Sequence, residues 1–247
     1  MPDAGPSIPV AVLEETPRFG VGAVLSRSFS VWLSNLPLFL GISLAFHLPL
    51  IFVRGVLPAG PVLRRFGWVA VTTLLGFVVS GAVIRGVVEQ LRGGRAGLAD
   101  SLQVAFRSLP RVVVTGFVAG VVIAFASLLL VVPGAVMSCS YFVVVPAAVI
   151  ERTPPFKSLA RSSELTDGYR WHLFGLFLVS RLLGAAIGLF AVAVFARTAG
   201  LTRAILMTVL PTAIATSLQA VFEGVAYYQL RVAKEGIDIE QLAAVFD

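Results

Sequence analysis

Residues 112–150 read VVVTGFVAGVVIAFASLLLVVPGAVMSCSYFVVVPAAVI, a run of 39 positions without one Asp, Glu, Lys or Arg. One unbroken helix over this run would measure about 58 Å at 1.5 Å per residue, roughly twice the thickness of a bilayer's hydrocarbon core. Pro133 and Gly134 lie near its middle; proline removes a backbone donor, and glycine permits a reversal. The run therefore predicts two membrane-spanning helices, at 111–132 and 134–151, joined by a tight turn. Pro146 is expected to kink the second of them.

Four further stretches are apolar enough to span a bilayer, which needs about 20 mostly apolar residues. The chain of 247 residues is 57% hydrophobic and only 13% charged, with a mean hydropathy of +0.93, whereas soluble domains carry about 25% charged residues. We therefore expect an all-α polytopic membrane bundle of six transmembrane helices. Its membrane domain is predicted at 16–230, between cytoplasmic tails at 1–15 and 231–247. The four further spans are predicted at 29–53, 66–91, 171–196 and 204–230.

The placement of basic residues predicts the orientation of the chain. Twelve Lys and Arg residues lie in segments on the N-terminal side of the membrane, and five lie in loops on the other side. Because cytoplasmic loops are enriched in Lys and Arg, this split places both termini in the cytoplasm. Amphipathic stretches at 16–25, 98–109 and 156–166 lie on the same side, and we expect them to form short interfacial helices. Each stretch precedes two spans, which is consistent with a threefold repeat of helix pairs.

Three charged residues fall inside predicted spans, namely Arg85, Arg181 and Glu223. Charged residues are costly in lipid and often mark a substrate or ion path. Glu89 shares a helix face with Arg85 at the i+4 position, so these four residues form a candidate intramembrane polar cluster. A structural ion pair, or extension of the charged ends toward the headgroups, would explain the same residues. The sequence leaves both interpretations open.

Basic and aromatic side chains also gather at the predicted cytoplasmic face. Anionic lipid headgroups attract such residues when they lie next to the ends of spans or on amphipathic helices. The candidates for headgroup contact are Arg107, Arg111, Lys157, Arg161, Arg170 and Trp171.

The sequence contains no catalytic or metal-binding pattern that would indicate an enzyme or a cofactor. Cys139 is the single cysteine. A nucleophilic pair with His47 would lack a third, orienting group, so we expect a buried thiol and a helix-packing imidazole. The Gly-x-x-x-Gly patterns at 116–120 and 184–188 predict close packing between helices of the bundle. The net charge of +6 arises from residues that flank apolar runs, which argues against a nucleic-acid partner.

Several short patterns stand out together: Val132-Pro133-Gly134, Pro146, Glu151, Ser158-Leu159, Arg161-Ser162, Leu165-Thr166-Asp167-Gly168, Arg170-Trp171 and a tail at 228–238. This set resembles the glycerophosphoryl diester phosphodiesterase membrane-domain family and its uncharacterised six-helix bacterial relatives. The family takes its name from members that join such a bundle to a soluble catalytic barrel of about 250 residues. No stretch of this chain could supply that barrel, so the resemblance implies a bundle in a bacterial inner membrane without an assigned reaction.

These observations predict a non-enzymatic membrane protein that acts as a scaffold, binds a protein partner or organises lipids. The first alternative is a small transporter or channel that uses Arg85, Arg181 and Glu223, and a further alternative is an intramembrane enzyme. A polar cavity that reaches mid-membrane depth beside these charges would favour transport, whereas a dry interior would favour the scaffold. No cofactor is expected, and membrane lipids are the expected partners.

Overall fold

The computed structural model describes residues 19–52, 60–91, 94 and 97–236, and the regular structure in these residues is entirely helical. A bent pair of helices, Val21–Ser34 and Leu36–Phe52, is long and apolar enough to form one membrane span. The chain is thus an all-α polytopic membrane protein with five candidate spans, or six with this pair. The other five are Val62–Leu91, Leu98–Leu129, Val131–Ile150, Arg170–Phe195 and Gly200–Glu235.

The first predicted span, at 29–53, is wrong as a single straight helix. Helix α1 (Val21–Ser34) ends before Asn35, and α2 (Leu36–His47) leaves at an angle of 83°. Pro37 explains the break, because it has no N–H group to continue the hydrogen-bond ladder of α1. The Asn35 side chain donates to the carbonyl of Val31 at 3.2 Å and so stabilises the end of α1.

The second predicted span is confirmed as α4 (Pro61–Leu91), which begins five residues before the predicted start. The next helix differs from the prediction. Residues 98–109 do not form a separate interfacial helix, because α5 (Leu98–Leu129) continues through Pro110 as one element. A proline inside a helix removes one hydrogen bond, and the packing of this long helix against α4 and α6 compensates for that loss.

The predicted hairpin is present, but its turn lies at Leu130 rather than at Pro133-Gly134. Leu130 adopts an extended conformation (φ −159°, ψ 150°) between α5 and α6 (Val131–Ser140). Pro133 is the third residue of α6, where an N–H group would have no partner within the helix. Gly134 faces Ser127 of α5, and a Cβ atom there would overlap the serine side chain and backbone. Glycine is therefore required by the close approach of the two helices.

The kink predicted at Pro146 lies about one turn earlier, at residues 141–143. There α6 ends and α7 (Val144–Ile150) begins. Pro146 cannot donate to the carbonyl of Phe142, and its ring would clash with that carbonyl in a continuous helix. Side chains of α8 (Pro155–Thr166) stabilise the break, since the hydroxyl groups of Ser162 and Thr166 donate to the carbonyl of Ser140 at 2.8 and 3.3 Å.

The last third of the chain forms a helical hairpin. Helix α9 (Arg170–Phe195) matches the predicted span at 171–196 within one residue. The returning arm consists of α10 (Gly200–Ala204), a π-helical segment η2 (Ile205–Val209) and α11 (Leu210–Glu235). It is longer at both ends than the predicted span at 204–230. The predicted tail therefore begins inside α11, and its remaining residues from 237 onward lie outside the described residues.

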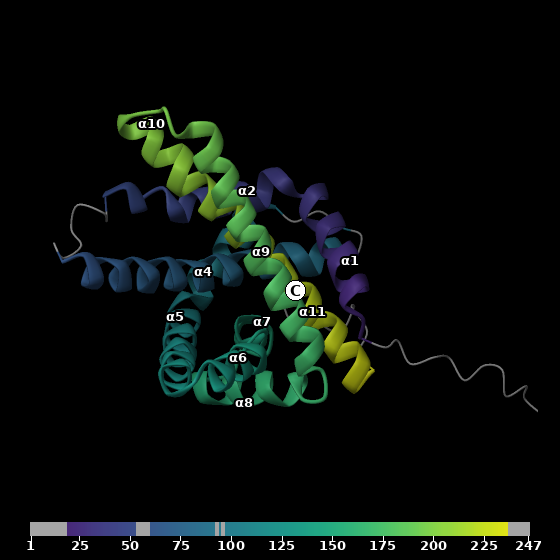
Figure 1. Cartoon of the computed structure of the whole chain (residues 1–247). Coiled ribbons are helices and arrows are strands. Elements are labelled where there is room, and N and C mark those ends of the chain that lie inside the picture. Colours follow the sequence, from purple (N-terminus) through teal and green to yellow (C-terminus); the bar gives the residue numbers. More distant parts are fainter. Residues whose placement is uncertain (1–18, 53–59, 92–93, 95–96, 237–247) are drawn as a thin grey trace, which may run out of the picture.

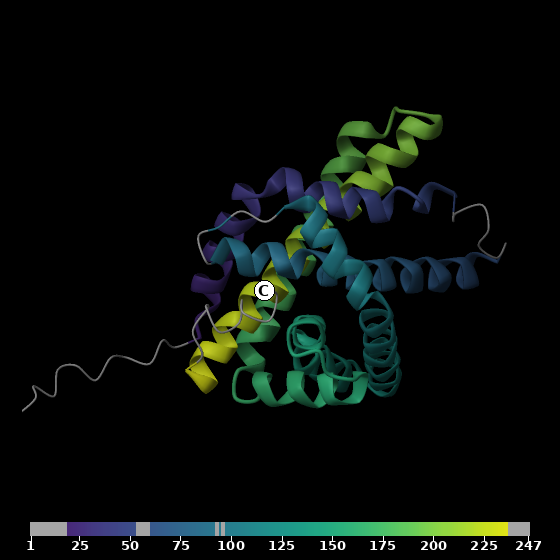
Figure 2. The same ribbon diagram turned by 180° about the vertical axis from the view of Figure 1, so that it is seen from behind.

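Helix α11 is the central element of the fold. Figures 1 and 2 show it crossing the middle of the molecule, with α2 and α4 on one side and α8 along the lower edge. It packs against α1, α2, α4, α7, α8 and α9. Its face toward these helices is closely packed and contains the fully buried side chains of Phe222, Tyr227 and Leu230. The burial of α11 thus holds the helical hairpins together.

The helix that opens each predicted repeat buries the same pattern of positions. In α1, in the first part of α5 and in α8, buried residues recur at i, i+4 and i+7, which places them on one face of each helix. Helix α1 ends before Asn35 and α8 ends before Asp167, whereas α5 continues. Amphipathic helices in general bury positions at this spacing, so the threefold repeat stays a prediction. The buried positions are Val24, Ser28 and Val31; Ser101, Ala105 and Ser108; and Ser158, Ser162 and Leu165.

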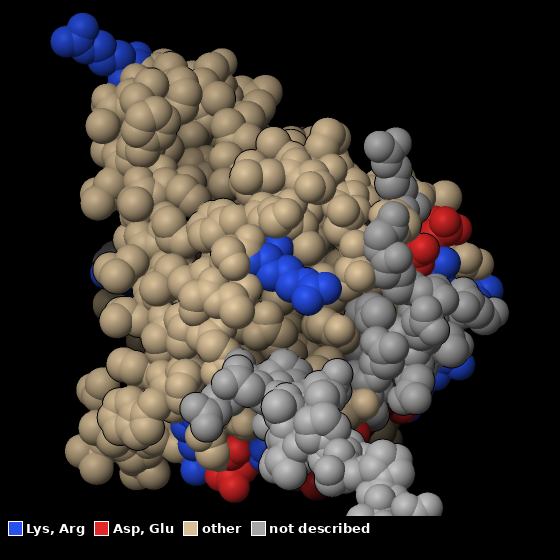
Figure 3. Space-filling view, turned by 90° about the vertical axis from the view of Figure 1, so that its right-hand side faces the viewer, with Lys and Arg blue, Asp and Glu red and all other residues tan. Residues whose placement is uncertain are grey.

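Large apolar side chains cover the outside of the molecule. Phe125, Leu128 and Val131 at the α5–α6 turn are 66%, 83% and 83% exposed, and Leu189 and Phe190 of α9 are similarly open. Figure 3 shows a broad, mostly uncharged surface with basic side chains near its centre and at its upper left, while the acidic side chains gather toward its right and lower edges. Soluble monomers rarely expose contiguous apolar patches larger than a few hundred Å². This surface is therefore suited to contact with hydrocarbon.

The two glycines of the 116–120 pattern have different surroundings, which yields a test of the packing. A Cβ atom on Gly116 would overlap the ring of Phe77 on α4, whereas one on Gly120 would meet no atom within 4 Å. We expect Gly116→Ala to destabilise the protein by about 1–3 kcal/mol, as overpacking does. Gly120→Ala should be neutral or stabilising by up to about 1 kcal/mol, since alanine favours helix. Thermal unfolding in detergent measures both, and equal effects would contradict this packing.

Candidate intramembrane groove

A groove of about 470 Å³ lies between α4, α9 and the η2–α11 arm. Helices α4 and α9 each pack against α11, and the space between them forms the groove, with α11 as its floor. Its volume is within the range of ligand sites, about 300–1,000 Å³. The wall of α4 contributes Thr72, Thr73, Gly76 and Phe77; that of α9 contributes Ser180, Arg181, Gly184, Ala185 and Gly188; and the floor contributes Met207, Pro211, Thr212, Ala215, Thr216, Gln219 and Glu223.

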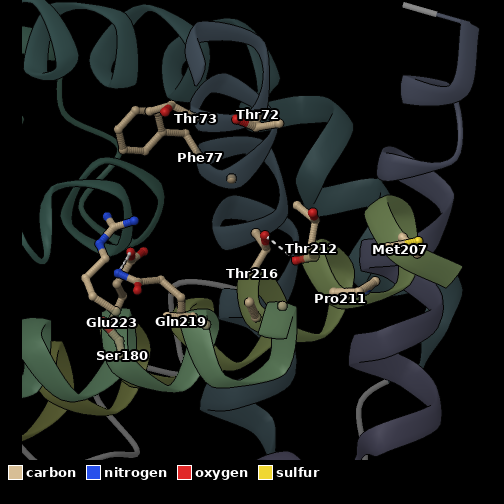
Figure 4. Close-up of a pocket in the computed structure, with 16 residues that line it drawn as sticks. Thr72, Thr73, Phe77, Ser180, Met207, Pro211, Thr212, Thr216, Gln219 and Glu223 are labelled. Atoms are coloured by element: carbon tan, nitrogen blue, oxygen red, sulfur yellow. Dashed lines mark hydrogen bonds between the residues drawn. The ribbon is translucent and has the colours of Figure 1, made fainter. Parts of the chain in front are cut away.

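A stripe of polar residues runs along the floor. Thr212, Thr216, Gln219 and Glu223 recur at i, i+4, i+7 and i+11, so they share one face of α11. Figure 4 shows them in a row, with Glu223 and Gln219 toward one end of the groove and Met207 and Pro211 toward the other. The sequence analysis identified only Glu223. The regular spacing of polar residues within an apolar span is the signal that would have revealed the others.

Glu223 lies at the end of the stripe that is farther from η2. Its carboxylate accepts hydrogen bonds from the hydroxyl group of Ser80 on α4 at 2.5 Å and from the amide of Gln219 at 3.1 Å. Twelve residues separate Glu223 from the end of α11 at Glu235, which corresponds to about 18 Å along the helix axis. Glu223 therefore lies well inside the span, where an ionisable group is costly unless it has polar surroundings.

Arg181 lies on the opposite wall, near the middle of α9. Its guanidinium group is 4.9 Å from the centre of the Phe177 ring and close enough to Glu223 for Coulomb attraction. It forms no ion pair within 4 Å and no hydrogen bond with any described residue, and it is exposed on the groove side. Of the four residues in the predicted polar cluster, Arg181 and Glu223 line this groove. Arg85 and Glu89 of the predicted cluster belong to α4 but are not among the residues that line it.

The hydroxyl groups along the groove donate to the backbone of their own helices. Thr212 donates to the carbonyl of Thr208 at 2.6 Å, and Thr216 donates to that of Thr212 at 2.7 Å. On the walls, Thr72 and Ser180 do the same, with donor–acceptor distances of 2.9 and 2.7 Å. A hydroxyl group has one proton and two lone pairs. With the proton used by the backbone, each hydroxyl oxygen is left as an acceptor.

The part of the groove that Met207 and Pro211 line coincides with an irregular stretch of backbone. The segment η2 is π-helical over Ile205–Val209, and Pro211 follows, which has no N–H group for the carbonyl of Met207. Single π-helical turns inside α-helices occur frequently at functional sites. Met207 and Glu223 lie 16 residues apart, about 24 Å along the helix. The groove is thus almost as long as a bilayer's hydrocarbon core is thick, which is about 30 Å.

The end of the groove at Glu223 is closed by the packing of α11 against α4. A Cβ atom on Gly224, the residue after Glu223, would meet Val87 and Ile84 of α4 at 3.0 and 3.1 Å. Val225 and Ala226, the next two residues, are completely buried. At the other end, no residue of α10 is buried. The groove is therefore blocked beyond Glu223, and its lining extends in the other direction as far as Met207, on the side of α10.

His47 and Cys139 do not form a catalytic pair. The Nδ1 atom of His47 lies 2.8 Å from the carbonyl oxygen of Ser43, and Nε2 lies 3.5 Å from the hydroxyl oxygen of Thr216. The imidazole is buried behind the groove floor, as predicted for a helix-packing residue. Cys139 is buried in the main core. In the described residues, no group of three or more His, Cys, Asp or Glu side chains could hold a metal ion.

Arg161, a predicted headgroup contact, is directed toward carboxylates instead. It donates to both oxygens of Glu151 at 2.8 and 3.0 Å, and it also pairs with Glu235 of α11. Burial opposes the charge, but the hydrogen bonds to Glu151 and Glu235 raise the pKa of Arg161 above its usual value. Tyr227 donates to Glu151 at 2.9 Å. These contacts tie α8 and the end of α7 to the end of α11.

The other predicted headgroup residues lie at the surface. Arg107, Lys157 and Arg170 are exposed, Arg111 is half-buried, and Trp171 is 84% exposed. Arg170 lies 3.3 Å from a carboxylate oxygen of Asp167 in the turn before α9. Contact with lipid headgroups stays a prediction for all of them.

A scan against protein-family models, a search of curated proteins and a search of solved structures each found no match to this chain. The resemblance to the phosphodiesterase membrane-domain family therefore stays a prediction. Several residues that carry it contact one another here, because Arg161 pairs with Glu151 while Ser162 and Thr166 stabilise the end of α6.

The Arg161 contacts can be tested by removing one charge from α8. We expect Arg161→Gln to destabilise the protein by about 1.5–3 kcal/mol, because hydrogen bonds to charged groups contribute this much and two carboxylates lose their partner. Arg161→Lys should lose part of this amount, since a point charge cannot replace the two-pronged contact. Lys157→Gln removes the same charge from an exposed position of the same helix and is the control. Unfolding midpoints that shift equally for Lys157→Gln and Arg161→Gln would contradict the assignment.

Proposed function

We propose that this membrane protein binds a ligand with a polar group in the groove and carries that group through the hydrocarbon layer. The observation that supports transport is the polar stripe of α11, which extends about 16 Å from Thr212 and ends at Glu223 beside Arg181. A scaffold needs an apolar surface and close packing, but it has no need of a polar groove at this depth. The proposed activity is non-enzymatic.

The energetics of a bilayer support this assignment. Polar side chains in the hydrocarbon core are expensive and usually face a bundle interior or a water-filled cavity. Here Thr212, Thr216, Gln219 and Glu223 all face one groove, although α11 has a fully packed face on its other side. Transporter sites commonly lie near the midplane, at helices with irregular backbone. The π-helical segment η2 and the depth of Glu223 fit that description.

The orientation proposed from the basic residues gives the groove a direction. With both termini in the cytoplasm, the closed end beyond Glu223 faces inward and the α10 end faces outward. A ligand would then enter from the outer side and reach Arg181 and Glu223 inside the membrane. Movement to the inner side requires the contact of Gly224 with Ile84 and Val87 to open.

The orientation is tested by cysteine labelling in a Cys139→Ala background. Lys157→Cys on α8 and Gly60→Cys at the start of α4 are both exposed positions. In intact spheroplasts, a membrane-impermeant maleimide should label the cysteine at position 60 and leave that at position 157 unlabelled until the membrane is broken. The reverse pattern would invert the proposed topology.

The groove itself is tested by a matched pair of neighbouring residues. Ala185 lines the groove, and Ala186 is equally exposed but is not among its lining residues. In proteoliposomes of the Cys139→Ala protein, we expect the impermeant maleimide to label Ala185→Cys at least ten times faster than Ala186→Cys. The two positions differ in depth by only about 1.5 Å, so depth cannot cause the difference. Equal rates would contradict a water-accessible groove and, with it, the proposed transport.

A further inference from the structure

The groove offers one group that requires an anion. The guanidinium of Arg181 has five N–H donors and cannot lose its charge. In the structure it contacts the face of Phe177, and no described residue accepts a hydrogen bond from it. It lines the groove within the central part of α9, where a charged group without hydrogen-bond acceptors is costly even with the Glu223 carboxylate nearby. A phosphate or carboxylate group would satisfy these donors with two parallel hydrogen bonds.

The floor of the groove has the opposite requirement. The hydroxyl oxygens of Thr212 and Thr216 are acceptors, because their protons are bound by backbone carbonyls. The carboxylate of Glu223 accepts two hydrogen bonds and retains further lone pairs. These acceptors suit a group that only donates, and an ammonium group has three donors and no acceptor.

The third feature of the groove is its mixed lining. Phe77, Met207 and Pro211 add apolar surface to the polar floor, and Gly184 and Gly188 leave space on the α9 wall. A Cβ atom on Gly188 would meet nothing within 4 Å, so this space is open. Arg181 and Ala185 are exposed on a helix that also exposes the apolar side chains of Leu182, Leu189 and Phe190. A ligand can thus have an apolar part in contact with the bilayer.

From these three features we infer that the groove binds a phosphate group joined by a short linker to an ammonium group. The phosphate pairs with Arg181, and the ammonium lies against the carboxylate of Glu223 at the same end of the groove. A simple cation would be repelled by Arg181, and a simple anion by Glu223. The chemistry is shared by a zwitterionic lipid headgroup and by a free solute of the same kind. This assignment rests on the proposed function, since it names the ligand of the same groove.

The test measures protection of the cysteine in Cys139→Ala/Ala185→Cys protein, which replaces no proposed ligand contact. In nanodiscs of phosphatidylglycerol, phosphoethanolamine should slow maleimide labelling at concentrations at least tenfold lower than ethanolamine or inorganic phosphate alone. Arg181→Gln should abolish this advantage, while Arg181→Lys should retain part of it. Glu223→Gln should weaken protection by phosphoethanolamine but leave protection by phosphate unchanged or stronger. Each variant is compared only if it elutes as the same monodisperse species as its parent.

A second arm distinguishes the source of the headgroup. Nanodiscs that contain phosphatidylethanolamine should protect the cysteine without added solute if a lipid is the ligand, and they should leave it reactive if the ligand is a free solute. Provided that added phosphoethanolamine slows labelling of the cysteine, either result supports a phosphate–ammonium ligand. Two outcomes would contradict a phosphate–ammonium ligand without contradicting a water-accessible groove. In the first, phosphate alone protects as well as phosphoethanolamine. In the second, the cysteine is reactive but neither phosphoethanolamine nor the lipid protects it. An unreactive Ala185→Cys cysteine overturns the proposed function as well.

Discussion

The close approach of α11 to α4 at Gly224 determines where the polar groups of this protein meet. A side chain at that position would press on Val87 and Ile84, so glycine allows the two helices to come together. The contact sets Glu223 next to Ser80, with 2.5 Å between the hydroxyl and carboxylate oxygens. Toward α10 the groove opens between α4 and α9. The closely packed region beyond Glu223 and the groove between α4 and α9 are therefore two consequences of one packing contact.

Most of the fold could be predicted from the sequence because hydrocarbon imposes a simple rule on composition and length. An uncharged run of 39 residues has to fold back, and the reversal is found within three residues of the predicted point. The errors occur at prolines. Pro37 ends a helix, Pro110 is accommodated inside one, and Pro146 acts one turn before its own position. Which outcome applies depends on the tertiary contacts of the freed carbonyls, such as that of Ser140, and a single sequence does not reveal those contacts.

The site was only half predictable for a related reason. Intramembrane charges are visible in a sequence, so Arg181 and Glu223 were identified, but their partners are not. Gln219 could have been found from its i−4 relation to Glu223, whereas Ser80 comes from another helix and has no local signal. Arg161 is a case in which the sequence predicts the wrong partner. Its place on an amphipathic helix predicts contact with lipid headgroups, but Glu151 and Glu235 lie close enough to form ion pairs with it. Charge alone does not separate a lipid contact from a tertiary one.

The two sides of the groove divide its properties between them. On α9 the small residues Gly184, Ala185 and Gly188 provide volume, and on α11 the polar stripe provides the chemistry. The pattern at 184–188 therefore does not serve close packing alone, because a Cβ atom on Gly184 would only make an ordinary contact with Ala215 at 3.7 Å, and one on Gly188 would face open space. In the pattern at 116–120, by contrast, Gly116 lies directly against Phe77. The same spacing thus joins two helices in one place and separates them in another. Whether two helices pack closely at such a pattern depends on the facing helix. Helix α4 presents the large side chain of Phe77, whereas α11 presents a stripe of short and polar side chains.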